Sequence, residues 1–402
     1  MKSTRRKANA PLGVRAMRFN RPGRGIRLVS ALWLLLLAAC VGGRSSEHDV
    51  VASTPPSGAI VWAEFSTHDT PVRSMALDGD NLWMGTMKGI IRFDITKREV
   101  EIYTPANTEG GFIARAVYIL SVDPKGNKWV GTYGGGLSRY DGKSWKRFST
   151  EDGLGDNWVY DIKYDRDGKM WVATWNGVSV LEGEKFKTYR VADGLPDKWV
   201  YSIAYDRDGV FWFGTEAGIS RFDGKSWRTF SHKDGVGGEI GENPAGSRPA
   251  SPFPAPEETE GGPGSGYGSS FLQHHMNMGK QNAGPNPDFI ISSLVDDRNR
   301  RWFGTWGGGV ASFDGSAWKN YTVRDGLGGD FVFTMAADRE GHVWAGTNGG
   351  ASWFDGTRWR NINTSRGLLD DYVFSMLFDK KGRRWFGTTK GLSVFKGGLP
   401  SE

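Results

Sequence analysis

The sequence is poor in the side chains that build metal and redox centres. Its 402 residues include a single cysteine and six histidines. One thiol excludes an intramolecular disulfide framework, a zinc site with four cysteine ligands and an iron–sulfur cluster, because each of these needs several cysteines. We therefore expect no bound metal and no cofactor.

The sequence also lacks a run of apolar residues long enough to cross a bilayer. The apolar stretch 28–39 (LVSALWLLLLAA) has 12 residues, whereas a transmembrane helix needs about 20. A basic segment precedes this stretch, which is the arrangement of an export signal. The N-terminus is therefore interpreted as a signal peptide.

The apolar stretch ends in Leu37-Ala38-Ala39-Cys40, which contains the only cysteine of the chain. This resembles the lipobox of bacterial lipoproteins, in which the cysteine carries the lipid. The resemblance implies a lipoprotein signal peptide over 1–39, membrane attachment through a lipid on Cys40 and a flexible tether over 40–56. Val41 after the cysteine implies sorting to the outer membrane, facing the periplasm or the cell surface. An ordinary signal peptide and a translation start at Met17 are the alternatives.

The body of the chain has no excess of positive charge. Residues 1–39 hold nine of the 51 basic residues and none of the 45 acidic ones, which accounts for the formal net charge of +6. From Cys40 onward, 42 basic residues face 45 acidic ones. A surface that binds nucleic acid needs a clustered excess of positive charge. We therefore expect no nucleic-acid partner.

Tryptophan and glycine are abundant, with 18 and 58 residues, and both mark an internal repeat. The pattern Trp-x-(Gly/Ala)-Thr starts at Trp83, Trp129, Trp171, Trp212, Trp302, Trp344 and Trp385. The copies are 41 to 46 residues apart, except for one interval of 90. That interval contains no further copy and is rich in Gly, Pro and Ser, so 233–288 is interpreted as an insertion between the fourth and fifth repeats.

Each repeat is predicted to form four short antiparallel strands. In the fourth copy, the apolar runs 200–205, 210–215, 219–222 and 225–230 are separated by turn sequences. Four strands in about 40–45 residues form one blade of a β-propeller. The last copy ends after its third strand, and 60–65 matches the missing fourth strand. The sequence therefore predicts an all-β, seven-bladed β-propeller over 57–398, in which the N-terminal strand closes the last blade.

The repeat resembles the two-component regulator propeller family. The resemblance rests on WVGTYGGGLSRYDGKSW at 129–145, WFGTWGGGVASFDGSAW at 302–318 and EDGLGDNWV at 151–159. In that family, such propellers form the periplasmic, ligand-sensing part of hybrid histidine kinases. The resemblance implies a sensing or binding module that feeds a two-component system. Because the chain ends at Glu402, soon after the last repeat, we do not expect it to signal by itself.

One face of the predicted propeller gathers aromatic side chains, because the loop between strands 2 and 3 and the segment entering the next blade lie on the same side. Flat rings among polar neighbours suit carbohydrate or aromatic ligands. Arg73, which replaces an aromatic residue of the strand-1 series, suits a carboxylate. The candidate ligand-binding residues are Tyr133, Trp175, Trp306, Trp158, Trp199, Phe331, Tyr372, Arg73 and Glu216. The alternative is that the recurring aromatic residues pack between blades.

Three functions stay open from the sequence. The first is a non-catalytic propeller lipoprotein of the bacterial envelope that binds a carbohydrate or a protein partner. The second is a lyase or hydrolase with an extracytoplasmic substrate, in which Asp161 and Glu216 depart from the repeat and could act as acid and base. The third is a protein scaffold in an envelope complex. The insertion carries His274, His275, Met276 and Met278, but it offers no further well-spaced ligand for a soft metal.

Overall fold

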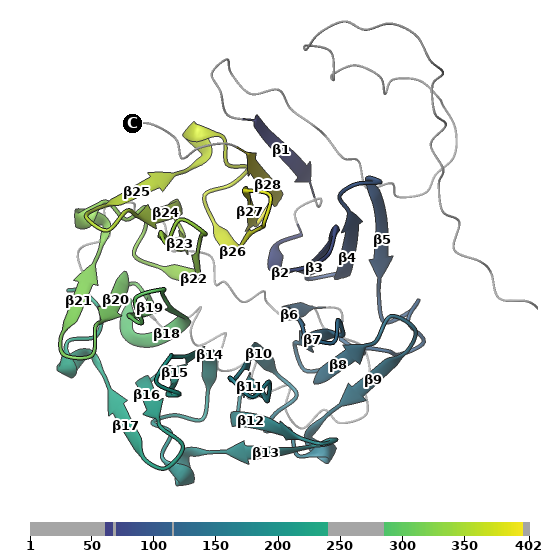
Figure 1. The fold of residues 1–402 in the computed structure, drawn as a ribbon, viewed down its shortest axis with the longest axis horizontal. Coiled ribbons are helices and arrows are strands. Elements are labelled where there is room, and N and C mark those ends of the chain that lie inside the picture. Colours follow the sequence, from purple (N-terminus) through teal and green to yellow (C-terminus); the bar gives the residue numbers. More distant parts are fainter. Residues whose placement is uncertain (1–60, 67–69, 115, 240–284, 397–402) are drawn as a thin grey trace, which may run out of the picture. The chain divides into compact units, whose positions relative to one another are not determined.

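The computed structural model describes residues 61–66, 70–114, 116–239 and 285–396. These residues belong to one unit, His48–Glu402. They form seven four-stranded antiparallel sheets, which stand as blades around a common centre (Figure 1). The prediction of a seven-bladed β-propeller is confirmed.

The first four blades follow the chain without interruption. Blade 1 consists of β2 (Val72–Asp78), β3 (Asn81–Thr86), β4 (Gly89–Asp94) and β5 (Glu99–Tyr103). Blade 2 consists of β6 (Val117–Val122), β7 (Lys128–Thr132), β8 (Leu137–Tyr140) and β9 (Trp145–Phe148). Blade 3 consists of β10 (Val159–Tyr164), β11 (Met170–Thr174), β12 (Gly177–Glu182) and β13 (Lys185–Tyr189). Blade 4 consists of β14 (Val200–Tyr205), β15 (Phe211–Thr215), β16 (Gly218–Phe222) and β17 (Trp227–Phe230).

The last three blades repeat the same order of strands. Blade 5 consists of β18 (Asn286–Val295), β19 (Arg301–Trp306), β20 (Val310–Phe313) and β21 (Trp318–Tyr321). Blade 6 consists of β22 (Val332–Ala337), β23 (Val343–Thr347), β24 (Gly350–Phe354) and β25 (Trp359–Ile362). Blade 7 consists of β26 (Val373–Phe378), β27 (Arg383–Thr388), β28 (Gly391–Lys396) and β1 (Val61–Ser66).

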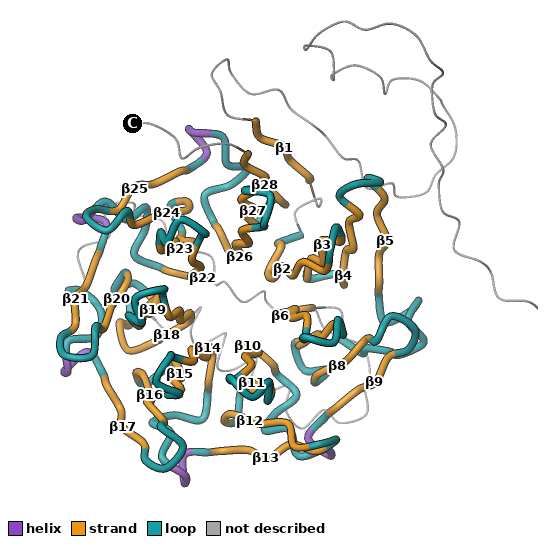
Figure 2. The backbone as a smooth tube through the Cα atoms, viewed as in Figure 1, coloured by secondary structure: helices purple, strands orange, loops and turns teal. Residues whose placement is uncertain are grey.

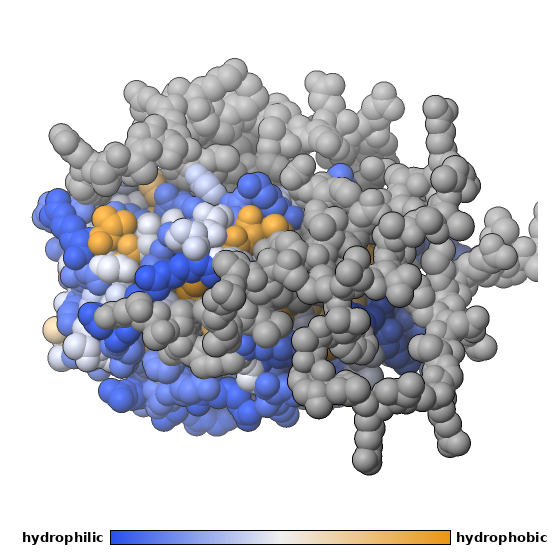
Figure 3. All heavy atoms as spheres, turned by 90° about the horizontal axis from the view of Figure 1, so that it is seen from above, coloured by the Kyte–Doolittle hydropathy of each residue, from blue (hydrophilic) through white to orange (hydrophobic). Residues whose placement is uncertain are grey.

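Within the described ranges, five short 3-10 helices lie at the outer edge of the ring, where the chain leaves one blade for the next (Figure 2). They are η1 (Thr150–Asp152), η2 (Val191–Asp193), η3 (His232–Asp234), η4 (Val323–Asp325) and η5 (Thr364–Arg366). Seen edge-on, the surface of the described residues is mostly hydrophilic, with small apolar patches (Figure 3). No helix among the described residues is long and apolar enough to span a membrane.

The N-terminal strand closes blade 7, as the sequence predicts. β1 pairs antiparallel with β28, with Val61 opposite Lys396 and Ser66 opposite Gly391. The two ends of the described chain thus share one sheet, and backbone hydrogen bonds link the start of the propeller to its end. This pairing also covers an edge of β28 that would otherwise be open to another chain.

The glycine of each Trp-x-Gly-Thr pattern sets the distance between neighbouring blades. A Cβ atom on Gly131 of blade 2 would lie 2.5 Å from Val159 Cγ1 of blade 3. A Cβ atom on Gly387 of blade 7 would lie 2.9 Å from Val72 Cγ1 of blade 1, where the ring closes. The recurring glycine is therefore a packing requirement. Blade 3 is an exception, because Ala173 occupies this position.

The recurring tryptophan is a core residue that also holds the turn between strands 1 and 2. In six blades its indole N–H donates to an aspartate six residues earlier. The pairs are Trp129–Asp123, Trp171–Asp165, Trp212–Asp206, Trp302–Asp296, Trp344–Asp338 and Trp385–Asp379. The same aspartates accept backbone amide protons of their own turns. The Asp-Arg-Asp-Gly turns at 165–168 and 206–209 are therefore closed by internal hydrogen bonds, as expected for hairpin turns.

Candidate functional site

Each of the seven innermost strands carries a β-bulge near its start. In β10, for example, Val159 pairs with Thr174 and Asp161 pairs with Ala173, so Tyr160 has no partner on β11. A bulge leaves one residue unpaired and redirects its side chain. The seven bulged residues are Arg73, Tyr118, Tyr160, Tyr201, Ile291, Phe333 and Phe374. The fold thereby places one side chain from each blade at the same level around the centre.

Contacts between aromatic rings run from blade to blade at this level. Successive ring centroids are 4.9 Å apart for Tyr118–Tyr160, 4.7 Å for Tyr160–Tyr201 and 5.0 Å for Phe333–Phe374. In blade 5 the bulged residue is aliphatic, and two other aromatic residues of this blade continue the series. The ring centroid of Phe289 lies 4.7 Å from that of Tyr201, and the ring centroid of Trp306 lies 6.3 Å from that of Phe333. We call Arg73, Tyr118, Tyr160, Tyr201, Phe289, Trp306, Phe333 and Phe374 the central ring.

Arg73 completes the central ring as its one cationic member. Its guanidinium carbon lies 4.1 Å from the ring centroid of Phe374 in blade 7 and 5.8 Å from that of Tyr118 in blade 2. The side chain is partly buried, its Nε is hydrogen-bonded to none of the described residues, and no described carboxylate forms an ion pair with it. Burial lowers the pKa of this guanidinium, yet arginine keeps its charge in proteins. The arrangement therefore fits an anionic group supplied by a ligand.

A second set of aromatic residues lies next to the central ring. Tyr133, Trp158, Trp175 and Trp199 follow one another with centroid distances of 3.8, 5.4 and 5.8 Å. The amide of Trp175 in a 2–3 turn donates to the carbonyl of Trp158 before strand 1, at 3.1 Å. The 2–3 turns and the entry segments thus share one face. Two further residues extend the set. The ring centroid of Phe331 lies 4.9 Å from that of Trp306, and the ring centroid of Tyr372 lies 6.1 Å from that of Phe333.

The predicted site residues differ in how much surface they offer. Trp175, Trp306 and Phe331 are 6 to 8% exposed, so their rings serve mainly as packing. Tyr133, Trp158, Trp199 and Tyr372 are half-buried. We call these four residues the aromatic rim. A role of the nine predicted residues in ligand binding stays a prediction.

Glu216 is hydrogen-bonded to a residue of the central ring. It occupies the 2–3 turn of blade 4, and its carboxylate accepts the phenolic proton of Tyr201 at 2.5 Å. Burial and the nearby charge of Glu216 raise the pKa of Tyr201 well above its ordinary value, so this phenol stays protonated. Tyr201 and Glu216 thus form a fixed polar pair among aromatic groups.

Asp161 has a structural role that sequence reasoning did not anticipate. Its Oδ2 accepts the amide proton of Ile203 in blade 4 and its Oδ1 that of Ile162, both at 2.8 Å. The Ser74 hydroxyl accepts the amide proton of Leu120 in the same way between blades 1 and 2. Burial raises the pKa of Asp161. Both oxygens therefore accept backbone hydrogen bonds, and Oδ2 joins blade 3 to blade 4. This leaves the proposed acid and base pair with Glu216 without support from geometry.

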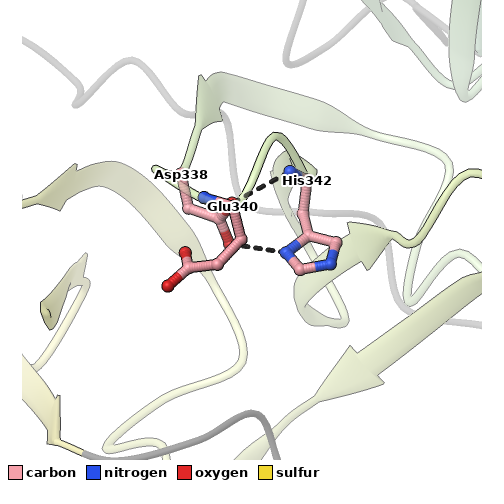
Figure 4. Close-up of side chains that lie close together, drawn as sticks. All are labelled: Asp338, Glu340 and His342. Carbon is pink, nitrogen blue, oxygen red and sulfur yellow. Dashed lines mark hydrogen bonds and ion pairs between the residues drawn. The ribbon is translucent and has the colours of Figure 1, made fainter.

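The described histidines lie away from the central ring. His342 belongs to the 1–2 turn of blade 6, where it lies close to Asp338 and Glu340 (Figure 4). Asp338 accepts hydrogen bonds from the His342 ring, from two backbone amides and from the Trp344 indole. The Arg384 guanidinium lies 3.6 Å from the carboxylate of Glu340. These carboxylates thus already have donors and a counter-ion, as in a closed turn. His232 bonds the carbonyl of Val236 at the outer edge.

Some of the sequence predictions concern residues outside the described part of the chain. The signal peptide over 1–39, Cys40 and the tether over 40–56 all lie there. Of the predicted insertion 233–288, the structure describes 233–239 and 285–288, and β18 begins at Asn286. All of these stay predictions.

Three repeats match a known family model, described as the two component regulator propeller, over residues 153–176, 194–217 and 326–349. Each match runs from the segment that enters a blade through its first two strands to the 2–3 turn. Of the predicted site residues, the matches include Trp158, Trp175, Trp199, Glu216 and Phe331. This confirms the resemblance found in the sequence: the chain contains two-component regulator propeller repeats.

Solved structures share the fold. The extracellular domain of BT3049 from B. thetaiotaomicron, described as a hybrid two-component system, is 22% identical with a TM-score of 0.62, and the match covers 82% of this chain and 39% of that one. A catalytically inactive virginiamycin B lyase from Staphylococcus aureus is 13% identical with a TM-score of 0.57, over 84% of this chain and 99% of the lyase. The match thus spans well under half of the length of the BT3049 extracellular domain. No curated protein matches it.

Proposed function

We propose that this chain is a non-catalytic, ligand-binding propeller of the bacterial envelope, attached to the membrane through a lipid on Cys40. Its aromatic face recognises a carbohydrate, and the bound state feeds a two-component signalling system. The two-component regulator propeller repeats and the similarity to an extracellular domain described as part of such a system support this placement.

The central ring, together with the aromatic rim, is the observation that carries the proposal. Trp158, Trp199 and Tyr372 at the start of blades and Tyr133 in the 2–3 turn of blade 2 are partly exposed, and polar groups such as Lys198 and Glu216 lie in the same segments. Sugars bind proteins by stacking their C–H faces on aromatic rings while polar groups fix their orientation. A carboxylate on the sugar would complement Arg73, which has no described anionic partner.

The described residues offer little for catalysis. Asp161 is engaged by two backbone amides, Glu216 by the Tyr201 hydroxyl, and neither His232 nor His342 belongs to the central ring. The fold alone does not assign the activity of the lyase to this chain. A protein scaffold remains the alternative to a carbohydrate receptor.

A thermal-shift screen with neutral and uronic-acid oligosaccharides and with envelope extracts tests the proposal. A ligand that binds the native state raises the melting temperature. We expect an acidic oligosaccharide to do so, and expect Trp199→Ala to fold and lose the shift. Trp227→Ala is the matched control, because Trp227 is also half-buried but lies on β17 at the outer edge.

The outcomes separate the functions. A glycan shift that survives both Trp199→Ala and Tyr372→Ala would place the ligand elsewhere and refute the role of the aromatic rim. If no glycan raises the melting temperature but an envelope protein binds, and if the same variants lose that binding, the chain is a protein receptor or scaffold.

A further inference from the structure

Blade 6 has a hollow of about 430 Å³ along its outermost strand, β25. The lining comes from β25 and the residues on either side of it, from β24, from η5 and from the end of the turn that contains η4. The residues that line it are Gly326, Trp353, Arg358, Trp359, Arg360, Asn361, Asn363, Ser365 and Arg366. We call it the blade-6 hollow. It lies at the outer edge of the ring, whereas the central ring is built on the innermost strands.

The side chains of the blade-6 hollow are mainly hydrogen-bond donors. Three guanidinium groups line it, from Arg358, Arg360 and Arg366. Among the carboxylates of the described residues, Asp355 accepts from Arg360 Nε at 3.2 Å. No described residue forms an ion pair or side-chain hydrogen bond with Arg366, which is exposed. The lining residues thus include three arginines and no carboxylate.

The amide side chains of the lining are neutral, and their oxygens already accept hydrogen bonds from hydroxyl groups. Asn361 Oδ1 accepts the hydroxyl proton of Ser352 at 3.1 Å, and Asn363 Oδ1 accepts that of Ser365 at 2.6 Å. Asn361 also donates to the carbonyl of Gly349. The lining thus presents surplus donors to whatever enters.

Comparison with the other blades shows which arginine is unusual. A basic residue at the position of Arg360 recurs in the outermost strands, at Lys146, Lys187, Arg228 and Lys319. Such charges protect an open sheet edge against pairing with another chain. Arg360 therefore needs no ligand to explain it.

Arg366 breaks the repeat instead. The third residue of η1, η2, η3 and η4 is aspartate, namely Asp152, Asp193, Asp234 and Asp325. In each case the carboxylate accepts the backbone N–H of the residue before the helix, at 2.7 to 3.0 Å. η5 has Arg366 at this position. The substitution removes a carboxylate that closes the turn and replaces its negative charge with a positive one, at the side of the hollow.

We propose that the blade-6 hollow binds a small organic molecule through an oxoanionic group, a phosphate or a sulfate ester. Guanidinium groups bind such oxygens through paired, charge-assisted hydrogen bonds. The hollow falls within the range of about 300–1,000 Å³ that is typical of ligand sites, which leaves room for the organic part beside the oxoanion. This site is separate from the aromatic face and does not depend on the proposed carbohydrate site.

Isothermal titration calorimetry of the detergent-solubilised full chain tests this inference. The probes are glucose 6-phosphate, glucose 6-sulfate, inorganic phosphate and glucose. We expect at least one of the two esters to bind, glucose not to bind, and Arg366→Asp to weaken ester binding at least tenfold. Arg366→Asp restores the aspartate of the other four turns, so we expect this variant to fold with an unchanged or higher melting temperature.

The control variants decide where the ester binds. Lys233→Asp makes the same change of charge in η3, on the other side of blade 5, and we expect it to alter the affinity less than twofold. Arg73→Met removes the cation of the central ring and is also expected to leave ester binding intact. Binding of inorganic phosphate alone, binding that survives Arg366→Asp, binding that is lost in Arg73→Met, or no binding of either ester would each overturn the inference.

Discussion

The guanidinium of Arg73 lies over the face of Phe374, with its Cζ 4.1 Å from the ring centroid. The two residues occupy the same bulge position in blades 1 and 7, so the contact joins the ring where its ends meet. An aromatic face attracts a cation, but a partly buried guanidinium still loses hydration that an ion pair would replace. Arg73 is therefore a position where the proposed ligand binding and the stability of the fold conflict.

We predict that Arg73→Met stabilises the protein in the absence of ligand. Methionine fills a similar volume without a charge, and replacing a buried, uncompensated charge with an apolar group raises the free energy of unfolding by about 1 kcal/mol or more. Urea unfolding of both proteins measures the change. Arg92→Met is the control, because Arg92 pairs with Glu101 near the surface. A lower stability of Arg73→Met would mean that the contacts with Phe374 and Tyr118 outweigh the lost hydration.

A second prediction concerns the glycine between blades. Gly131→Ala should destabilise the propeller by about 1–3 kcal/mol, because the new Cβ would lie 2.4 Å from Ile119 Cγ2 and 2.5 Å from Val159 Cγ1. Blade 3 already has Ala173 at this position, so Ala173→Gly should cost only about 0.5–1 kcal/mol, through the flexibility of glycine in a strand. Denaturant midpoints of the two variants give the comparison. Equal effects would show that the blades can shift apart without loss.

The repeat made most of the fold predictable from the sequence. A period of about 42 residues with Trp-x-Gly-Thr fixed the number of blades, and the pattern of 60–65 identified the strand that closes the ring. In the fourth copy, the predicted strands agree with β14 to β17 within two residues. These features depend on local pattern, which sequence reasoning can assess.

The site was only partly predictable, because its geometry depends on long-range contacts. The shared face of the 2–3 turns and the entry segments followed from strand order. The bulges did not, since a bulge is seen only when the pairing partner is known. The role of Asp161 depends on an amide 42 residues away. The sequence shows that Arg366 stands where the other turns have an aspartate. The role of that aspartate became clear only from the hydrogen bonds that it accepts in the other four turns.

A third prediction follows from the turn of blade 4. Arg301 of blade 5 donates to Asp206 at 2.6 Å, and Asp206 also accepts from the Trp212 indole at 2.8 Å. Burial opposes the charge of Asp206, but hydrogen bonds from Trp212, the Val210 amide and Arg301 outweigh it, so its pKa lies below the ordinary value. We expect Asp206→Asn to lower the free energy of unfolding at pH 7 by about 2–3 kcal/mol, since the buried Arg301 then keeps only the exposed carboxylate of Asp208 as its ion-pair partner.

The pH dependence of this effect has a definite sign. A carboxylate with a lowered pKa in the folded state stabilises the fold fully above its ordinary pKa of about 3.9, and this stabilisation is lost as the pH falls further toward the folded value. The difference between the wild type and Asp206→Asn should therefore be largest at pH 6–7 and shrink below about pH 4. Unfolding curves at pH 7 and pH 3 measure it, with Asp167→Asn as an exposed turn control. A difference that is the same at both pH values would show that the Asp206 charge is not the cause.

The last prediction concerns the closure by β1. A chain that begins at Thr70 lacks β1, which removes the antiparallel pairing from Val61–Lys396 to Ser66–Gly391 and leaves β28 with an open edge. We expect this chain to melt at a lower temperature than one that begins at Ser57, which keeps β1. We also expect it to self-associate with rising concentration, because an unpaired strand edge accepts another chain. Calorimetry and analytical ultracentrifugation of the two chains separate these effects. If both melt alike and stay monomeric, the pairing of β1 with β28 adds no stability, and the ring is held by the contacts between its innermost strands, such as the hydrogen bond from the Ser375 hydroxyl to the Val72 carbonyl.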